Sequence, residues 1–210
     1  MYRALVLVAL TGIAHADELA TLSANAPTCE RATCIGLRLH VPVEDNRPLA
    51  TPAWTAAQLA AANRHFAPLG VGFQLVGIAP LPASAARVED RDERTAFSAR
   101  MSGKVVDVFI TGHLDDVDTP GAMARGVTWH TKRGKLIIVS TQGVDLVLAH
   151  ELGHLFGLPH STYPISIMNK TPRDEPPREE RTFHADELVK LKSRIRALVR
   201  SGAYVNLAGT

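Results

Sequence analysis

Three histidines, one glutamate and one glycine follow the spacing H-E-x-x-H-x-x-G-x-x-H between residues 150 and 160. Residues four apart share one face of an α-helix, so His150 and His154 can direct ring nitrogens at one point. Gly157 lets the backbone leave the helix, and the returning chain brings His160 within reach of the same point. Three protein nitrogens with a fourth position open are typical of a catalytic zinc site, whereas structural zinc sites are closed. Glu151, next to His150, is placed to accept and donate protons there.

A metal-free alternative is a helix whose histidines are buried and hydrogen-bonded to one another. Burying three imidazoles and a carboxyl group in an apolar helix is costly unless every polar group finds a partner. The pattern therefore favours a zinc site, with His150, His154 and His160 as the metal ligands and Glu151 as the catalytic residue.

A second pattern follows the third histidine. Ser166-Ile167-Met168-Asn169 contains the only methionine downstream of His160, eight residues after it. Together, the histidine pattern and this methionine resemble the metzincin metalloproteases, and Ser161 directly after the third histidine is similar to the matrixin branch. The resemblance is specific over residues 145–169 and architectural elsewhere. It implies that Met168 forms a methionine turn beneath the metal, although a methionine also commonly fills a core.

The resemblance implies a secreted zinc-dependent endopeptidase that hydrolyses peptide bonds with a zinc-activated water and Glu151 as general base. It implies one catalytic Zn²⁺ and a protein or peptide substrate. Some metzincins have a tyrosine just after the methionine, but Asn169 and Lys170 stand there in this chain, so a tyrosine-assisted mechanism is not expected. Two alternatives are a silent binding module with the zincin fold and a zinc peptidase restricted to one partner or to short peptides.

The element that positions substrate is also implied by the resemblance. In metzincins the strand before the active-site helix forms the lower edge of the sheet and pairs with extended substrate. That edge corresponds here to Gly126, Val127, Thr128 and Trp129. An open edge presents unpaired N–H and C=O groups to which a peptide can add as a further strand.

Two charged stretches precede that strand. Residues 113–118 contain one histidine and three aspartates in a predicted loop, and matrixins bind structural calcium and a second zinc in this region. The carboxylates could hold a structural Ca²⁺, although the spacing is not that of an EF-hand and a solvated loop is the alternative. Residues 89–94 mix both charge signs, which is typical of a solvated loop or an exposed helix face.

The periodicities predict alternating strands and helices, and the resemblance implies an α/β fold of the metzincin-like zincin type. That fold comprises a twisted, mostly parallel sheet with an antiparallel edge strand, an active-site helix, and a small C-terminal lobe ending in a helix. The predicted helices are 51–67, 144–156 and 183–199, and the predicted strands are 37–43, 71–79, 104–111, 124–130 and 135–140. Ser140 or Thr141 is expected to cap the central helix. Pro42 suggests an edge strand or a strand end, and His40 and His65 are expected to face solvent.

The first residues read as a cleavable signal peptide, residues 1–16. Arg3 precedes an apolar run, and Ala14-His15-Ala16 fits the cleavage pattern, so the mature chain is expected to begin at Asp17. The alternative is a membrane anchor, but the run is shorter than the roughly 20 residues that span hydrocarbon. We expect a secreted or periplasmic protein without a membrane segment after cleavage. We expect residues 17–210 to form one metalloprotease domain, with an upper lobe over about 34–157 and a lower lobe over about 158–210.

Composition and cysteine spacing further narrow the classes of protein to which the chain can belong. The chain is 46% hydrophobic and 21% charged, and its formal net charge of +2 gives no support for nucleic-acid binding. Cys29 and Cys34 are the only cysteines, and in an oxidising compartment they favour a local disulfide. A free thiol or a cysteine switch that caps the zinc is the alternative.

Overall fold

The computed structural model describes residues 19–23 and 26–209. The predicted signal peptide and its cleavage site lie outside these residues, so both remain predictions. None of the described helices combines the length and hydropathy needed to cross a membrane.

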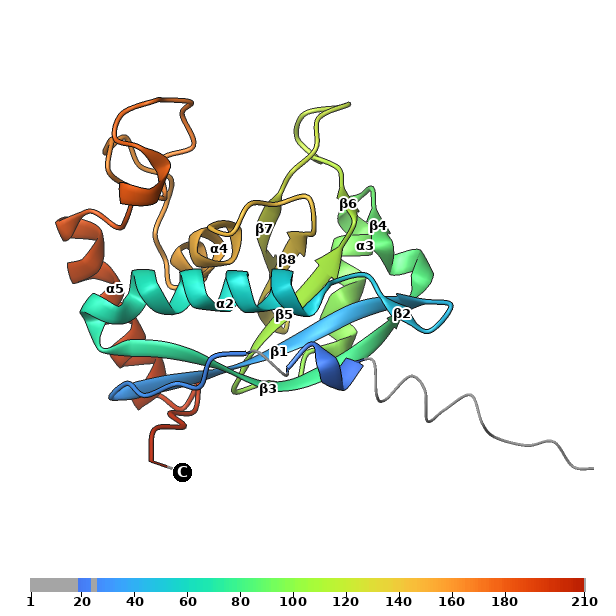
Figure 1. The fold of residues 1–210 in the computed structure, drawn as a ribbon, viewed down its shortest axis with the longest axis horizontal. Coiled ribbons are helices and arrows are strands. Elements are labelled where there is room, and N and C mark those ends of the chain that lie inside the picture. The colour runs from blue at the N-terminus through green and yellow to red at the C-terminus, as the bar shows by residue number, and fades with distance from the viewer. Residues whose placement is uncertain (1–18, 24–25, 210) are drawn as a thin grey trace, which may run out of the picture.

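The centre of the molecule is one six-stranded sheet (Figure 1). Four strands run parallel in the order β3 (Val71–Pro82), β1 (Thr33–Glu44), β5 (Val106–Thr111) and β8 (Gly134–Ser140). β7 (Gly126–Thr131) pairs antiparallel with β8 at one edge, and the short β2 (Arg47–Pro48) pairs antiparallel with the end of β1. β4 (Arg87–Val88) and β6 (His113–Leu114) form a separate two-stranded sheet. The predicted mixed α/β fold with an antiparallel edge strand is confirmed.

Both faces of the sheet are covered, which explains one wrong prediction about β1. Pro42 suggested an edge strand or a strand end; β1 lies between β3 and β5, and Pro42 stands near its end, beyond the Leu37–His40 segment that pairs with β5, so the strand-end alternative is confirmed. His40 is buried rather than solvated, and its Nε2 lies 2.8 Å from Oδ1 of Asp107 while its ring stacks on Phe109. A strand buried on both faces has no solvent side for alternating polar residues to mark.

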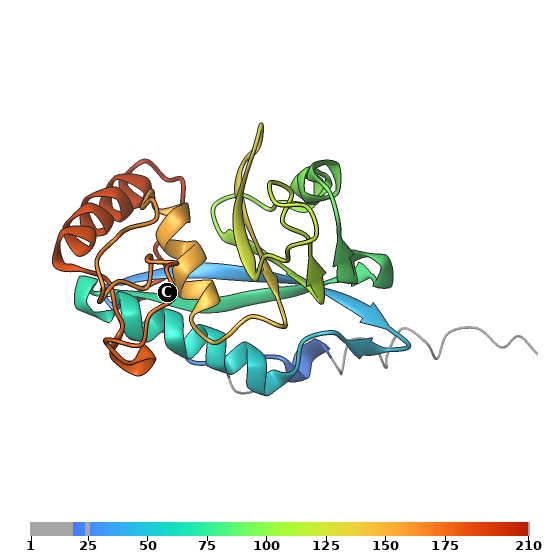
Figure 2. The ribbon, with the colours of Figure 1, turned by 90° about the horizontal axis from the view of Figure 1, so that it is seen from above.

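Helix α2 (Pro52–Phe66) packs beside the active-site helix α4 (Val147–Leu155) on one face of the sheet (Figure 2). The hydroxyl of Thr51 accepts the N–H of Trp54 at 3.2 Å, which confirms the predicted start of α2. His65 near its end is buried, contrary to expectation, because Thr182 and Phe183 of the C-terminal lobe lie against it. That contact joins residues more than a hundred positions apart, so no local pattern reveals it.

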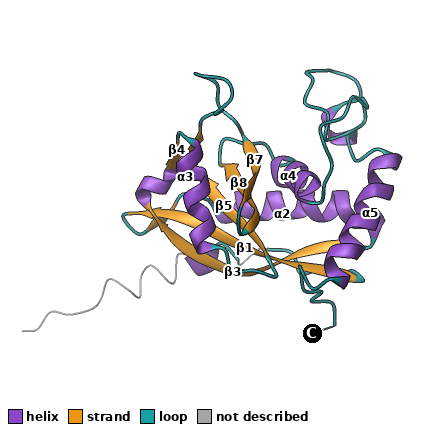
Figure 3. Cartoon of the chain, turned by 180° about the vertical axis from the view of Figure 1, so that it is seen from behind, coloured by secondary structure: helices purple, strands orange, loops and turns teal. Residues whose placement is uncertain are grey.

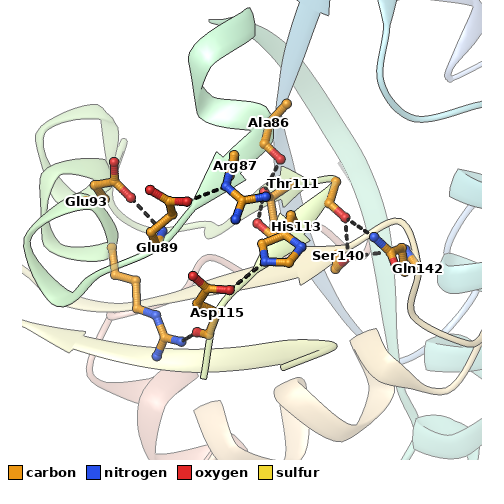
Figure 4. Close-up of polar contacts among 11 residues, drawn as sticks. Ala86, Arg87, Glu89, Glu93, Thr111, His113, Asp115, Ser140 and Gln142 are labelled. Atoms are coloured by element: carbon orange, nitrogen blue, oxygen red, sulfur yellow. Dashed lines mark hydrogen bonds and ion pairs between the residues drawn. The ribbon is translucent and has the colours of Figure 1, made fainter. Parts of the chain in front are cut away.

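The start of α4 also differs from the prediction. α4 begins at Val147, and neither Ser140 nor Thr141 caps it, since the N-cap Leu146 has no side-chain hydrogen bond. The hydroxyl of Ser140 instead donates to the carbonyl of Gly112 at 3.0 Å and accepts the N–H of Gln142 at 3.2 Å (Figure 4). Ser140 therefore fixes the turn that leaves β8, and the helix starts after that turn.

The C-terminal lobe follows α4 and ends in α5 (Ala185–Arg200), as predicted. The charged stretch before β5 contains the short helix α3 (Arg91–Ala96), and α3 and α5 lie at opposite ends of the sheet (Figure 3). Single 3₁₀ turns occupy Ala67–Leu69, Ala83–Ala86, Phe97–Arg100 and Arg178–Glu180. The rest of residues 171–184 is irregular apart from the last of these turns.

Cys29 and Cys34 form a disulfide just before and at the start of β1. The predicted local disulfide is therefore confirmed, and the free-thiol alternative is excluded. Both sulfur atoms are used in this bond, so neither cysteine can cap a metal in this state.

Candidate metal centre

His150, His154 and His160 converge on one point. Nε2 of His154 lies 3.0 Å from Nε2 of His150 and 3.2 Å from Nε2 of His160. One potential ligand atom from each of the three histidines lies within 4.8 Å of the others. Within the described residues, no other group of three histidine, cysteine or acidic side chains comes together in this way. The spacing seen in the sequence therefore folds into the expected cluster.

Two of the imidazoles are oriented by backbone carbonyls. Nδ1 of His150 lies 2.7 Å from the carbonyl oxygen of Ile167, and Nδ1 of His154 lies 2.7 Å from that of Leu158. A carbonyl can only accept, so each Nδ1 carries the proton and donates, and each Nε2 keeps a free lone pair. This outer hydrogen bond is the usual device that fixes a metal-binding histidine.

Burial keeps these rings neutral. It lowers the pKa of His150 to about 4, and it lowers the pKa of His154 as well. Burial and then the nearby Lys170 ammonium lower the pKa of His160. A neutral imidazole is the form that binds a metal.

The donor set fits zinc. The Nε2 atoms of His150 and His154 face each other at 3.0 Å without a proton to share, an arrangement that a cation between the lone pairs relieves. Nitrogens bound tetrahedrally at about 2.0–2.1 Å from zinc lie about 3.3 Å apart, close to the spacing found here. The three histidines leave a fourth position open to the cleft.

The turn after α4 explains how His154 and His160 are placed. Gly157 has φ of 97°, a conformation that favours glycine, and its N–H donates to the carbonyl of His154 at 3.0 Å. The N–H of Leu158 then donates to the carbonyl of Gly153 at 2.9 Å. The same turn that ends the helix thus aims the Leu158 carbonyl at the ring of His154 and returns the chain to His160.

Glu151 lines an open cleft of about 700 Å³ together with the three histidines. Its side chain is nearly fully buried, and burial raises the pKa of the carboxyl group to about 8. The hydroxyl of Thr128 lies 2.7 Å from the backbone oxygen of Glu151 and 3.0 Å from its Oε2. Thr128 therefore ties the edge strand to the carboxyl group.

The edge strand β7 lies along this cleft, as the resemblance implied. Gly126, Val127 and Thr128 line the cleft, and a Cβ on Gly126 would lie 2.6 Å from Cγ1 of Val147. Glycine at this position is what allows β7 to approach α4 so closely. The fourth predicted residue is directed elsewhere, since the indole N–H of Trp129 donates to the hydroxyl of Thr95 at 3.0 Å.

Met168 lies beneath the histidines in a fully buried turn. Its sulfur occupies the space beside Gly153, 2.5 Å from where a Cβ would stand on that residue. The hydroxyl of Ser166 accepts the N–H of Met168 at 2.9 Å and lies 2.7 Å from Oε2 of Glu187. Ser166 and Glu187 were not anticipated, because the capping box that Glu187 forms at α5 has His184 as its N-cap in place of the usual serine or threonine.

The predicted calcium loop gives no comparable cluster. Oδ1 of Asp115 lies 2.5 Å from Nε2 of His113 (Figure 4), and Asp118 is paired with Arg91. Asp115 and Asp118 already have side-chain partners, so structural calcium remains a prediction without support from this geometry.

Comparison with known proteins agrees with this geometry. A sequence model of the matrixin family matches residues 81–192, more than half of the 210-residue chain. No match was found among curated proteins. The fold is similar to that of archaemetzincin from Methanopyrus kandleri, with a TM-score of 0.51 and 18% identity over 80% of this chain and 99% of that one. It is also similar to metalloproteinase-II from Bacteroides fragilis, with a TM-score of 0.52 and 14% identity over 80% of this chain and 55% of that one.

Proposed function

This chain belongs to the matrixin family and is a zinc metallopeptidase, and we propose that it is an exported endopeptidase whose zinc is held by His150, His154 and His160. The convergence of the three Nε2 atoms beside Glu151 is the observation that carries the proposal. Zinc in such a site polarises a carbonyl group and makes water a stronger acid.

Glu151 acts as the general base and acid. Its carboxylate accepts a proton from the water that attacks the scissile carbonyl and passes that proton to the leaving amine as the C–N bond breaks. The hydroxyl of Thr128 lies 3.0 Å from Oε2 of Glu151 and holds that oxygen in place. A buried carboxyl group with one constrained oxygen is suited to moving a proton at the other.

Substrate binds in an extended conformation along β7. Among the residues that the structure describes, this strand pairs with β8 alone, so its outer edge is open beside the cleft that contains Glu151. A peptide that pairs with Gly126–Thr128 would place its scissile bond next to the three histidines. Backbone pairing along a strand favours substrates that have several residues around the scissile bond, which supports an endopeptidase.

Export rests on the sequence of residues 1–16 and is supported by the disulfide between Cys29 and Cys34, a bond typical of oxidising compartments. Mass spectrometry of the protein recovered outside the cytoplasm should give Asp17 as the first residue. An N-terminus at Met1 would contradict cleavage.

Cleavage of casein and of a peptide library, with and without a zinc chelator, tests the endopeptidase proposal. We expect internal bonds to be cut, and we expect the chelator to stop the reaction and added zinc to restore it. Removal of terminal residues alone, or cleavage that survives the chelator, would contradict it.

A further inference from the structure

A second cavity of about 600 Å³ adjoins the metal centre. It lies between the start of β7, the start of α4 and the irregular segment 167–181. Gly126, His150 and Glu151 line both this cavity and the metal cleft, so the two are continuous. A side chain of a substrate residue next to the scissile bond can therefore enter it. We refer to this cavity as the basic pocket.

Its charge is strongly one-sided. Among the residues that line it, Glu151 is the only acidic side chain. Five cationic side chains line it: Arg125, Lys170, Arg173, Arg178 and Arg181. None of the ion pairs among the described residues involves any of the five. The acidic residues within 174–180 lie in the same segment, yet they do not line the cavity. A cleft lined by one sign of charge concentrates its field on an oppositely charged ligand.

Two of the cations form a fixed wall. The guanidinium of Arg173 donates to the carbonyl oxygens of Pro164 and Ser166 at 2.7 Å each, and Nε of Arg181 donates to that of Pro176 at 2.9 Å. These acceptors are neutral, so the hydrogen bonds hold both side chains in place without cancelling their charge. Burial, and after it the charge of the neighbouring Arg181, lowers the pKa of Arg173.

The other three cations are available to a ligand. Arg125, Lys170 and Arg178 are exposed, and their side chains make no hydrogen bond or ion pair with any described residue. Arg125 directly precedes β7, whereas Arg178 lies across the cavity in the C-terminal lobe. An anion between them would be approached from two sides by guanidinium groups, which bind carboxylates in a planar fork.

The inner wall is apolar. Val144, Leu146, Val147 and Ile167 line the same cavity. A glutamate side chain could place its methylene groups against these residues and its carboxylate among the guanidinium groups.

We propose that the basic pocket recognises an acidic side chain of the substrate, so that this peptidase selects aspartate or glutamate, chiefly glutamate, beside the bond it cleaves. The inference rests on the proposed endopeptidase function and adds its specificity. Arg125 and Arg178 are the specificity-determining residues, and Arg173 and Arg181 maintain the positive field.

Matched peptides test the pocket. After library cleavage identifies a cut site, two peptides are compared that differ only in glutamate or glutamine at the position that enters the pocket. We expect kcat/KM to favour glutamate by roughly tenfold or more, mainly through KM, because charge-assisted hydrogen bonds are stronger than neutral ones. The preference should shrink at about 1 M salt, where charges are screened over about 3 Å.

Charge-reversal variants assign the effect. Arg125→Glu combined with Arg178→Glu should abolish the preference for glutamate, whereas Arg196→Glu on the outer face of α5, which does not line the pocket, should leave it unchanged. If the double variant does not fold, the single variants Arg125→Gln and Arg178→Gln replace it, and each should reduce the preference for glutamate. An unchanged glutamate preference in all of these variants would overturn the assignment.

Binding separates this inference from the proposed function. Zinc-loaded Glu151→Ala protein is titrated with the glutamate peptide and its glutamine counterpart by fluorescence anisotropy. We expect roughly tenfold tighter binding of the glutamate peptide. Equal binding would overturn the pocket inference even if the wild-type enzyme cuts peptides. Selective binding without any wild-type cleavage would instead support the pocket and contradict the endopeptidase proposal.

Discussion

The sulfur of Met168 lies 2.5 Å from the point where a Cβ on Gly153 would stand. Gly153 belongs to the helix turn between the first two histidines of the site, and Met168 is fully buried beneath it. The absent side chain at residue 153 is therefore what lets the methionine turn pack against the active-site helix.

Gly153→Ala should force Met168 and the neighbouring Phe183 to move. Overpacking of a filled core typically costs about 1–3 kcal/mol, and we expect a loss of that size in the free energy of unfolding, together with weaker zinc binding. Chemical denaturation and zinc titration measure the two effects. Gly77→Ala is a matched control, because its Cβ would meet nothing closer than 3.5 Å. An equal loss in both variants would show that the contact with Met168 is not responsible.

Ser166 joins two parts of the C-terminal lobe. Its hydroxyl accepts the N–H of Met168 and hydrogen-bonds the buried carboxyl group of Glu187. Ser166→Ala should cost about 1–3 kcal/mol, because both buried groups lose a partner. A double-mutant cycle with Glu187→Gln, followed by denaturation, should show that the two effects are not additive. Strictly additive losses would contradict a shared network.

Glu151→Ala should separate catalysis from metal binding. The variant should keep about one zinc per chain and lose roughly 10²-fold or more in kcat/KM, because the ligands remain and the general base is gone. Metal analysis and peptide cleavage measure both, with the exposed Glu179→Ala as the control variant. Wild-type turnover in Glu151→Ala would refute its role.

His65 should make the fold sensitive to acid. Burial, and secondarily the charge of Arg64, lower its pKa from 6.5 to about 4 in the folded protein. Its pKa is higher in the unfolded chain, so unfolding takes up a proton as the pH falls below about 6.5. The stabilisation is complete above that pH and is lost progressively down to about pH 4, by at most about 1.4 kcal/mol per pH unit.

Denaturation curves of His65→Gln between those pH values measure this contribution. The variant should show a weaker loss of stability with acidification than the wild type, and His130→Gln, at an exposed position, is the control. Parallel pH profiles for wild type and His65→Gln would contradict the assignment.

The centre of the site could be predicted because its information is local. A spacing of four residues places His150 and His154 on one face of α4, and the turn at Gly157 brings His160 back to them. The arrangement of the three histidines therefore follows from residues that are close in sequence. Short apolar runs predicted the positions of the main strands, and the resemblance to metzincins implied the mixed sheet with its antiparallel edge.

What sequence analysis missed depends on distant segments. His40 and His65 are buried by residues far along the chain, and their isolated polar positions carry no sign of that cover. The basic pocket likewise combines Arg125 with Arg178 from the opposite lobe. Neither arginine belongs to a pattern, and only the fold brings them to the same cavity.

The central claim is that three histidines bind one zinc ion. Elemental mass spectrometry tests it most directly, by measuring the zinc content of dialysed wild type, His154→Ala and His130→Ala. If three imidazoles bind one ion, we expect about one zinc per chain in the wild type and in His130→Ala, and a loss of nearly all zinc in His154→Ala. Full zinc in His154→Ala, or a wild-type protein that takes up none, would contradict it.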